Sequence, residues 1–348
     1  MASRIAVLTP FAFPSVRGNA VTVERVARGL RKRGLEVSVW DLSATPEAAI
    51  EAAVQADRPC VIHAFNAYRA GPLALRLARR MELPLVVTLT GTDANHDLFD
   101  PERAAVMRRV LEGAAAIVVF HGSIGERIAA TLADLQARLI TVPQAAALSA
   151  GESFDLATRW PLPAGRTLFL FPGGLRPVKR PRLPLVPLGR LVARRPDLRL
   201  LYAGPVLDAS EGEALHAALA GRPWARHGGT VPHAQMASLL GQADVVLNCS
   251  ISEGGMANSV LEALAAGRAV LAADIEGNRS LIEDGVTGLL FQGERELEAQ
   301  AERLVADPAL RARLGAAGRA RMTALYPPAR EIGGYLDVYR RLVPVPQR

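Results

Sequence analysis

Short runs of valine, isoleucine and leucine recur along almost the whole chain, and helix-like segments separate them. Most of these runs are apolar throughout instead of alternating between apolar and polar residues. Such runs are typical of parallel strands that helices cover on both faces, so they predict an α/β fold. The runs are RIAVLTP, LEVSVWDL, CVIHAF, LPLVVTLTG, AAIVVFHG and RLITVPQ, followed by RTLFLFPGG, LRLLYAGP, ADVVLNCS, RAVLAAD and TGLLFQG.

The alternation breaks at residues 145–165, a stretch rich in small residues, serine and proline. A chain of 348 residues is too long for one ordinary core, so we expect a domain boundary there. Each half opens with a strand, a glycine-containing loop and a helix. Two doubly wound parallel-sheet domains of the Rossmann type would bind ligands at the carboxyl ends of their strands. We expect them to face each other across a cleft.

Two helical regions are readable in more detail. In NAVTVERVARGLRKRG the apolar residues fall at helical spacing, with Asn19 as the expected N-cap and Gly34 as the stop. From Glu294 to Val343 the chain reads as almost entirely helical, with an interruption near Pro327 and Pro328.

The composition restricts the partners. Lysine and arginine total 41 against 34 acidic residues, which gives a net charge of +7. A solvent-exposed surface rich in arginine explains this charge. The alternatives are an anionic substrate and loose attachment to an anionic membrane. Nucleic acid is disfavoured because aromatic residues are only 5% of the chain and no RNA-stacking or finger motif occurs. Nothing in the sequence indicates an oligomeric state.

The two cysteines and the N-terminus favour the cytoplasm. Cys60 and Cys249 lie within apolar runs, so we expect two buried thiols and a reducing compartment. The opening segment MASRIAVLTP turns to proline too early for a signal peptide. No apolar run approaches the ~20 residues of a membrane-spanning helix.

Residues 248–278 hold the densest set of candidate functional residues. A strand is expected to end near Ser250, and Glu253 follows directly. Two glycines, Gly254 and Gly255, then permit unusual backbone dihedrals. A helix is expected to begin near residue 257 or 258, and its first-turn N–H groups would favour an anion such as phosphate.

Two carboxylates flank that helix start. Glu262 lies in the second helical turn, where it could accept hydrogen bonds from vicinal hydroxyls such as those of a ribose. The structural alternatives are that Glu253 only satisfies the helix dipole and that Glu262 is a solvated helix residue. With two glycines between them and a strand before, the pair favours a functional role.

Lysine is rare in this chain, which contains only Lys32 and Lys179. Lys32 lies in LRKRG, where it is expected at an exposed helix end. Lys179 instead follows a strand and a Gly-Gly turn in FPGGLRPVKRP, so it is a candidate for a specific charge. An exposed lysine at a helix start is the alternative, and Arg180 and Arg182 are expected to be ordinary surface residues.

Residues 248–278 resemble the signature of the retaining, GT-B-fold glycosyltransferases of the "glycosyl transferases group 1" family. That signature is a glutamate, a glycine-containing loop, a helix with a second glutamate, A-x-G-x-P-V-x-A and G-x-x-G-x-L. EDGVTGLLF matches its end, and GTVPHAQM at 229–236 is similar to the stretch that lies against the nucleotide base. The segments GNAVTVERV, TGTDANHD, GLRPVKRP and SEGG resemble the glycosyltransferase-1-domain-containing subgroup and, more loosely, selenosugar synthases.

The resemblance implies that residues 1–150 form a Rossmann-like acceptor-side domain, completed by a C-terminal helix at 327–348. Residues 160–326 would form the domain for the nucleotide-sugar donor. The implied reaction moves a sugar from a nucleotide diphosphate, most commonly UDP, to an acceptor hydroxyl with retention at the anomeric carbon.

Negative charge grows on the leaving diphosphate in such a reaction, and fixed cations stabilise it. Relatives use an arginine and a lysine after the first strand of the second domain. Here Gly174 occupies the usual arginine position, so Arg176 and Lys179 are the candidates. Since no D-x-D pair stands at a strand end, no metal or other cofactor is expected beside the nucleotide sugar.

The resemblance also implies roles for the remaining candidates. Glu253 would hold hydroxyls of the sugar and Glu262 those of the ribose. Asp93 would orient an acceptor or act as a base, with a loop-forming Asx turn as its alternative. The implied donor-binding residues are Gly18, Asn19, Gly174, Val231, Gly254, Gly255, Met256, Ala257, Asn258 and Glu262.

The chain departs from the family pattern twice. The family usually spaces its glutamates as E-x7-E, whereas Glu253 and Glu262 enclose one additional residue. Many members have histidine where this chain has Thr90, and His96 and His121 are the candidate substitutes.

Three alternatives remain at this stage. One is another enzyme of the same fold, such as an epimerase or a selenosugar-synthase-like transferase. A Rossmann oxidoreductase is disfavoured because no G-x-G-x-x-G follows any strand. The third is a non-catalytic sugar- or nucleic-acid-binding module, against which Arg176, Lys179 and Glu253 argue.

Overall fold

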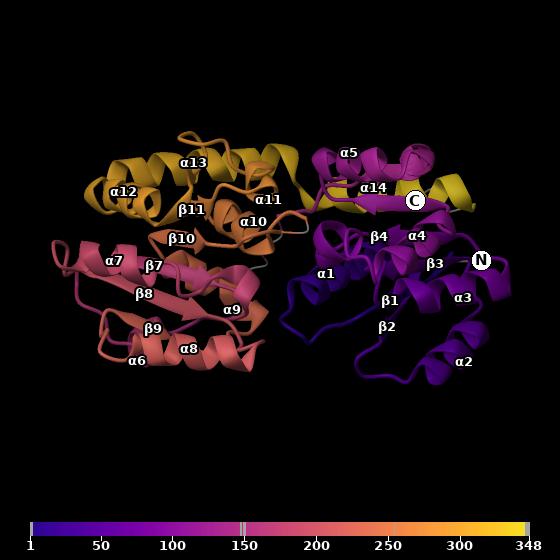
Figure 1. Ribbon diagram of the computed structural model, residues 1–348, viewed down its shortest axis with the longest axis horizontal. Coiled ribbons are helices and arrows are strands. Elements are labelled where there is room, and N and C mark those ends of the chain that lie inside the picture. The colour runs from indigo at the N-terminus through magenta and orange to yellow at the C-terminus, as the bar shows by residue number, and fades with distance from the viewer. Residues whose placement is uncertain (1–2, 147, 149–150, 254, 345–348) are drawn as a thin grey trace. The chain divides into compact units, whose positions relative to one another are not determined.

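The computed structural model describes residues 3–146, 148, 151–253 and 255–344, and it divides the chain into two compact units (Figure 1). The first unit is Met1–Ala145, Gly254–Met256 and Pro328–Arg348. The second unit is Ala146–Glu253 and Ala257–Pro327.

The first unit is built on a six-stranded parallel sheet in the order β2-β1-β3-β4-β5-β6. The strands are β1 (Arg4–Thr9), β2 (Glu36–Asp41), β3 (Val61–Phe65), β4 (Leu85–Thr88), β5 (Ala116–Val119) and β6 (Leu139–Thr141). The helices are α1 (Gly18–Lys32), α2 (Glu47–Asp57), α3 (Gly71–Met81), α4 (Ala104–Glu112), α5 (Gly122–Thr131) and α14 (Pro328–Leu342), with a π-helical turn at Asp93–Asp97 and a 3-10 helix at Ala133–Arg138.

Helices cover both faces of this sheet, as its apolar strands require. Residues of α2, α3, α4 and α5 pack on one face, where Leu8, Ile62 and Val87 are buried. Residues of α1 and α14 pack on the other, where Ile5 and Val86 are buried. The unit is therefore doubly wound.

The second unit holds another six-stranded parallel sheet, in the order β12-β11-β10-β7-β8-β9. Its strands are β7 (Thr167–Pro172), β8 (Leu198–Ala203), β9 (Ala225–His227), β10 (Val245–Asn248), β11 (Ala269–Ala273) and β12 (Leu289–Phe291). Its helices are α6 (Leu156–Arg159), α7 (Leu185–Val192), α8 (Ala209–Leu219), α9 (His233–Gln242), α10 (Asn258–Ala265), α11 (Glu276–Arg279), α12 (Gly293–Ala306) and α13 (Pro308–Leu325), with a 3-10 turn at Pro177–Lys179.

The strand predictions are confirmed, because every apolar run named above contains a strand. One strand was missed. β9 is three residues long, lies at the sheet edge and carries the exposed Arg226, so it has no apolar run to reveal it.

Helix ends are confirmed in part. Gly34 follows the end of α1 with φ +84°, which suits glycine. The expected N-cap Asn19 is wrong, because α1 begins at Gly18 and Arg17 is the N-cap. In the tail the break before Pro328 is confirmed. A second break lies at Asp307, whose side chain caps α13 by accepting a hydrogen bond from Leu310 N at 2.9 Å.

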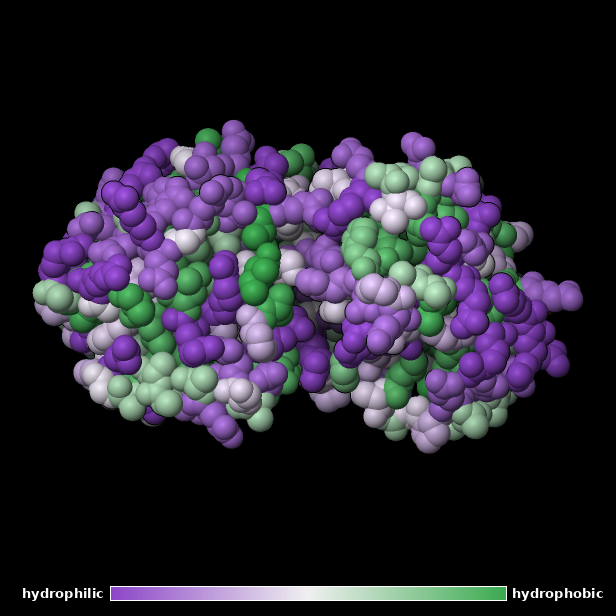
Figure 2. All heavy atoms as spheres, in the orientation of Figure 1, coloured by the Kyte–Doolittle hydropathy of each residue, from purple (hydrophilic) through white to green (hydrophobic). Residues whose placement is uncertain are grey.

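The surface agrees with the arginine-rich composition. The face shown in Figure 2 carries mainly hydrophilic residues, with hydrophobic residues in separate patches on both units. Cys249 is buried, whereas Cys60 is only half-buried, which corrects the expectation of two buried thiols. None of the helices within the described ranges combines the length and apolarity needed to cross a lipid bilayer.

Polar residues fix α14 to the sheet of the first unit. The buried His63 ring pairs with Tyr339 Oη at 2.7 Å and Thr88 Oγ1 at 2.8 Å. Burial lowers the pKa of His63 to about 3, so the ring is neutral at physiological pH. Glu331, with only 1% of its side chain exposed, accepts two hydrogen bonds from Arg25, at 2.7 and 2.8 Å.

We predict that Glu331→Gln destabilises the protein by about 3–5 kcal/mol, because it removes the charged partner of an arginine whose side chain is 10% exposed. Denaturant-induced unfolding measures this change. The matched control is Asp337→Asn on the same helix, whose pair with Arg340 is exposed and should contribute little. Equal effects of the two substitutions would contradict the prediction.

Candidate active site

The candidate site lies where β7 and β10 end. These strands are neighbours and run parallel, so their carboxyl ends share one edge of the sheet. The loop after β7 leads to the 3-10 turn at Pro177–Lys179, and the loop after β10 leads to Glu253. A backbone hydrogen bond from Ile251 N to Val178 O, at 2.8 Å, joins the two loops.

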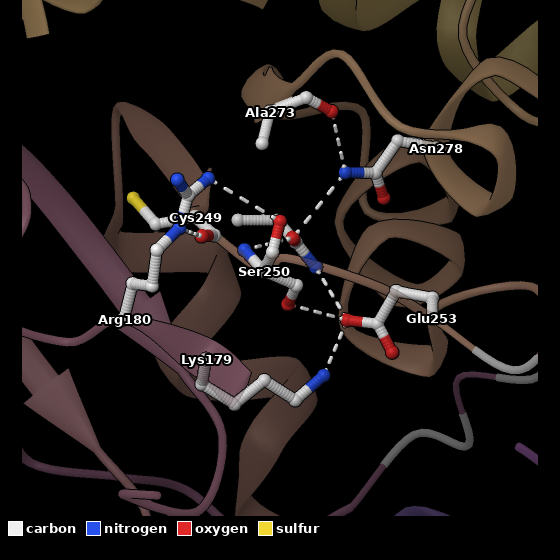
Figure 3. Close-up of polar contacts among 8 residues, drawn as sticks. Lys179, Arg180, Cys249, Ser250, Glu253, Ala273 and Asn278 are labelled. Atoms are coloured by element: carbon white, nitrogen blue, oxygen red, sulfur yellow. Dashed lines mark hydrogen bonds and ion pairs between the residues drawn. The ribbon is translucent and has the colours of Figure 1, made fainter. Parts of the chain in front are cut away.

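Three side chains at this edge of the sheet converge on the Glu253 carboxylate (Figure 3). Its Oε1 accepts hydrogen bonds from Lys179 Nζ, from Ser250 Oγ at 2.6 Å and from Asn248 Nδ2 at 3.1 Å. Only 12% of the Glu253 side chain and 17% of the Lys179 side chain are exposed. Burial acts to raise the pKa of Glu253, but the Lys179 charge and these donors outweigh it and lower that pKa. Glu253 is therefore ionised at neutral pH.

Two asparagines fix the position of Glu253. Asn248 contacts it directly, and Asn278 contacts Asn248. Asn248 Oδ1 accepts from Ser250 N at 3.1 Å and from Asn278 Nδ2 at 3.3 Å. Asn278 is fully buried and also donates to Ala273 O, at 2.9 Å, where β11 ends (Figure 3). Sequence analysis did not single out these residues. The only signal was a polar Asn248 inside an apolar run.

Arg180 has a structural role that the sequence did not indicate. Its Nε donates to Cys249 O at 2.7 Å, which ties the β7 loop to the end of β10 (Figure 3). The expectation of an ordinary surface residue is therefore wrong for Arg180. For Arg182 it agrees with the structure, since 54% of that side chain is exposed and it pairs with Glu211 at 2.8 Å.

Arg176 stands directly before the 3-10 turn that carries Lys179. Its guanidinium makes no hydrogen bond or ion pair with any residue in the described ranges, and its Nε is buried. Because a buried donor without a partner is costly, this group is suited to receive an anionic ligand.

Close backbone packing shapes the loop after β7. Gly173 has φ +144°, and Gly173 N donates to Ala203 O at 2.9 Å. A Cβ on Gly174 would lie 2.3 Å from Leu207 Cδ1, so a side chain there would displace the Leu207 side chain. Val231 is buried in the segment between β9 and α9.

The helix start after Glu253 is confirmed, because α10 begins at Asn258 with Ala257 as its N-cap. Ala257 has no polar side-chain atom, so the N-cap residue makes no side-chain hydrogen bond to the first turn of α10. Glu262 lies in the second turn, and its Oε1 is 2.8 Å from Nε2 of His233, the first residue of α9. The sequence did not single out His233 either.

Other predicted residues lie in the first unit. Gly18 and Asn19 open α1, and Asn19 Nδ2 donates to Thr9 Oγ1 at 2.8 Å. Gly255 and Met256 also group with the first unit, and Gly254 lies outside the described residues.

Asp93 is fully buried in the loop after β4. Its carboxylate accepts hydrogen bonds from four backbone N–H groups, at distances of 2.7–3.2 Å. Burial raises the pKa of Asp93 although these donors act in the opposite direction. These contacts show that the Asp93 carboxylate holds the backbone of its loop in place. That Asp93 orients an acceptor or acts as a base stays a prediction. The donors are the backbone nitrogens of Ala67, Thr90, Gly91 and Ala94.

The two histidines considered near Thr90 differ in exposure. His96 is exposed within the π-helical turn. His121 is buried at the start of α5, where its Nδ1 lies 2.8 Å from Ser123 Oγ. A role for either ring toward a donor sugar stays a prediction.

Two family models match this chain. Residues 155–321 match "Glycosyl transferases group 1", and residues 38–143 match "Glycosyl transferase 4-like domain". The chain thus matches a group 1 glycosyl transferase over its second half and a glycosyl transferase 4-like domain over most of its first half. It is thus a glycosyltransferase, and its two parallel six-stranded sheets are those of the GT-B fold.

Individual proteins similar to this glycosyltransferase cover most of its length. Glycosyltransferase 1 domain-containing protein 1 of Xenopus tropicalis is 26% identical over 303 residues, 85% of this chain and 86% of that protein. Phosphatidyl-myo-inositol mannosyltransferase of Mycolicibacterium smegmatis is 28% identical over 324 residues, 82% of this chain and 80% of that protein. The crystal structure of Anabaena HepE with UDP-glucose has a TM-score of 0.75 at 15% identity, covering 97% of this chain and all of that one.

The glycosyltransferase's Lys179–Glu253 pair yields a pH-dependent prediction. Because the folded-state pKa of Glu253 is lowered, its ionisation stabilises the fold above the unfolded-state pKa of about 4.3, and this stabilisation is lost as the pH falls through the folded-state value. We predict that Lys179→Met costs about 3 kcal/mol near pH 7. The cost should shrink as the pH falls below about 4.3, the unfolded-state pKa, as measured by denaturant unfolding.

Lys32→Met is the matched control, since Lys32 is the other lysine of the chain and lies exposed at the end of α1. It should change the unfolding free energy little at either pH. A Lys179→Met cost that does not depend on pH would show that the pair does not govern Glu253 ionisation.

Proposed function

We propose that this glycosyltransferase moves a sugar from a uridine diphosphate sugar to an acceptor hydroxyl and retains the anomeric configuration. The observation that carries the proposal is the Lys179–Glu253 pair at the carboxyl edge of the second sheet, with Arg176 on the same loop as Lys179. HepE, which contains UDP-glucose in its crystal, supports the choice of nucleotide.

The cations fit a leaving diphosphate. Arg176 has no partner within the described ranges, and the only partner of the Lys179 ammonium there is Glu253. An ammonium has three N–H donors, so Lys179 can contact Glu253 and a phosphate oxygen together. In this proposal the two side chains supply the positive charge that the transfer requires, without a metal.

The carboxylates fit the uncharged parts of the donor. Glu253 would accept hydrogen bonds from sugar hydroxyls, and Glu262 from the ribose. The N-cap residue Ala257 makes no side-chain hydrogen bond to α10. The N–H groups of the first turn of α10 would donate hydrogen bonds to the phosphates.

The proposed reaction balances without a protein nucleophile. The bond between the anomeric carbon and the diphosphate oxygen breaks, and the acceptor oxygen forms its bond on the same face of the sugar. The proton of the acceptor hydroxyl passes to an oxygen of the leaving diphosphate. Arg176 and Lys179 stabilise the charge on that group as it departs.

The donor assignment predicts that UDP binds more tightly than GDP or ADP, as measured by isothermal titration calorimetry. With UDP-glucose, the enzyme should release UDP slowly by hydrolysis, and the first sugar product should have the α configuration by NMR. A first product with the β configuration would exclude retention, and preference for GDP or ADP would exclude a uridine donor.

The role of Arg176 predicts that Arg176→Ala lowers the turnover of UDP-glucose by about 10- to 150-fold, because a charge-assisted contact of about 1.5–3 kcal/mol is lost from the transition state. Arg182→Ala is the control on the same segment, since Arg182 pairs with Glu211. Similar turnover in both variants would remove Arg176 from the site.

A further inference from the structure

His233 and Glu262 meet although they belong to different helices. His233 is the first residue of α9, after the loop that follows β9, and Glu262 lies in the second turn of α10. The imidazole Nε2 is 2.8 Å from Glu262 Oε1. The exposed fractions of the two side chains are 30% and 12%, so the pair is accessible but largely enclosed.

The imidazole leaves one side of the carboxylate available. His233 is the only partner of Glu262 among the residues that the structure describes, and it occupies Oε1. A carboxylate has about four acceptor positions on its two oxygens, so Oε2 can still accept hydrogen bonds. Vicinal hydroxyls, such as the 2′- and 3′-hydroxyls of ribose, supply two donors at a suitable spacing.

Fixing the carboxylate matters because a free glutamate loses rotamer entropy when it binds a ligand. That cost is about 1.5–2 kcal/mol for a fully immobilised long polar side chain. A glutamate that an imidazole already holds has lost part of its rotamer entropy before the ligand binds, so binding costs less. This effect is preorganisation.

We infer that His233 is a positioning residue that holds Glu262 for the ribose and thereby makes the site select ribonucleotides over 2′-deoxyribonucleotides. The inference rests on the proposed function, in which Glu262 contacts the ribose. His233 itself acts through Glu262 and does not touch the reacting atoms. A His233–Glu262 contact with no role in binding would instead leave the discrimination between the two sugars unchanged.

The test compares the binding of UDP and 2′-deoxy-UDP by calorimetry, with GDP and ADP and their 2′-deoxy forms in parallel. The wild type should bind UDP about tenfold more tightly than 2′-deoxy-UDP, the equivalent of one charged hydrogen bond. His233→Ala should weaken UDP binding by about the same factor and 2′-deoxy-UDP binding little, so that the two affinities converge.

Four further variants extend the comparison. His233→Gln places an N–H donor near the position of Nε2 and should restore most of the discrimination. His233→Ala combined with Glu262→Gln should bind UDP no more weakly than Glu262→Gln alone, because the two residues act as one unit. Arg190→Ala, which breaks an exposed pair with Glu298 between α7 and α12, should change neither affinity.

The outcomes separate the two ideas. If the wild type binds none of the three nucleotides, the proposed function fails and the inference fails with it. If UDP binds but His233→Ala weakens both ligands equally or neither, the inference alone is overturned. Circular dichroism and thermal unfolding of each variant show whether it remains folded.

Discussion

The parallel pairing of β7 with β10 decides where the polar residues of the second unit meet. Val245 and Val246 lie beside Phe169 and Leu170, so both strands end at the same edge of the sheet. Lys179 and Glu253, 74 residues apart in sequence, are brought together there. Antiparallel pairing would place the two strand ends on opposite edges, and no common site could form.

Three neighbouring strands cooperate to hold one carboxylate. β7 leads to Lys179, β10 ends in Asn248, and β11 ends at Ala273, whose carbonyl orients Asn278. Burial alone would favour a neutral glutamate. The cation and the amide and hydroxyl donors reverse that preference, so Glu253 stays charged while being held in one orientation. The buried asparagines thus connect the interior of the sheet to the edge that carries Glu253.

The sequence was sufficient to predict the fold and the loops that carry the candidate site. It was not sufficient to predict individual side-chain contacts. Continuous apolar runs locate strands because buried parallel strands leave no other pattern, whereas edge strand β9, with Arg226, has none. The start of α10 was predictable from Gly254 and Gly255. The contacts of Arg180 and His233 were not, because each depends on two loops or helices that only the tertiary fold brings together.

The composition of the first unit has a consequence for its synthesis. Tyr335 and Tyr339 of α14 are fully buried in a core that also contains residues of α1 and of strands β1 to β5. Domains generally fold as units while the chain emerges from the ribosome, the N-terminal part first. Here α14 follows the whole second unit along the chain, so the part of the sheet face that Tyr335 and Tyr339 cover stays open while that unit is translated. The second unit can therefore complete its core before the first one does, although it follows the first sheet in the sequence.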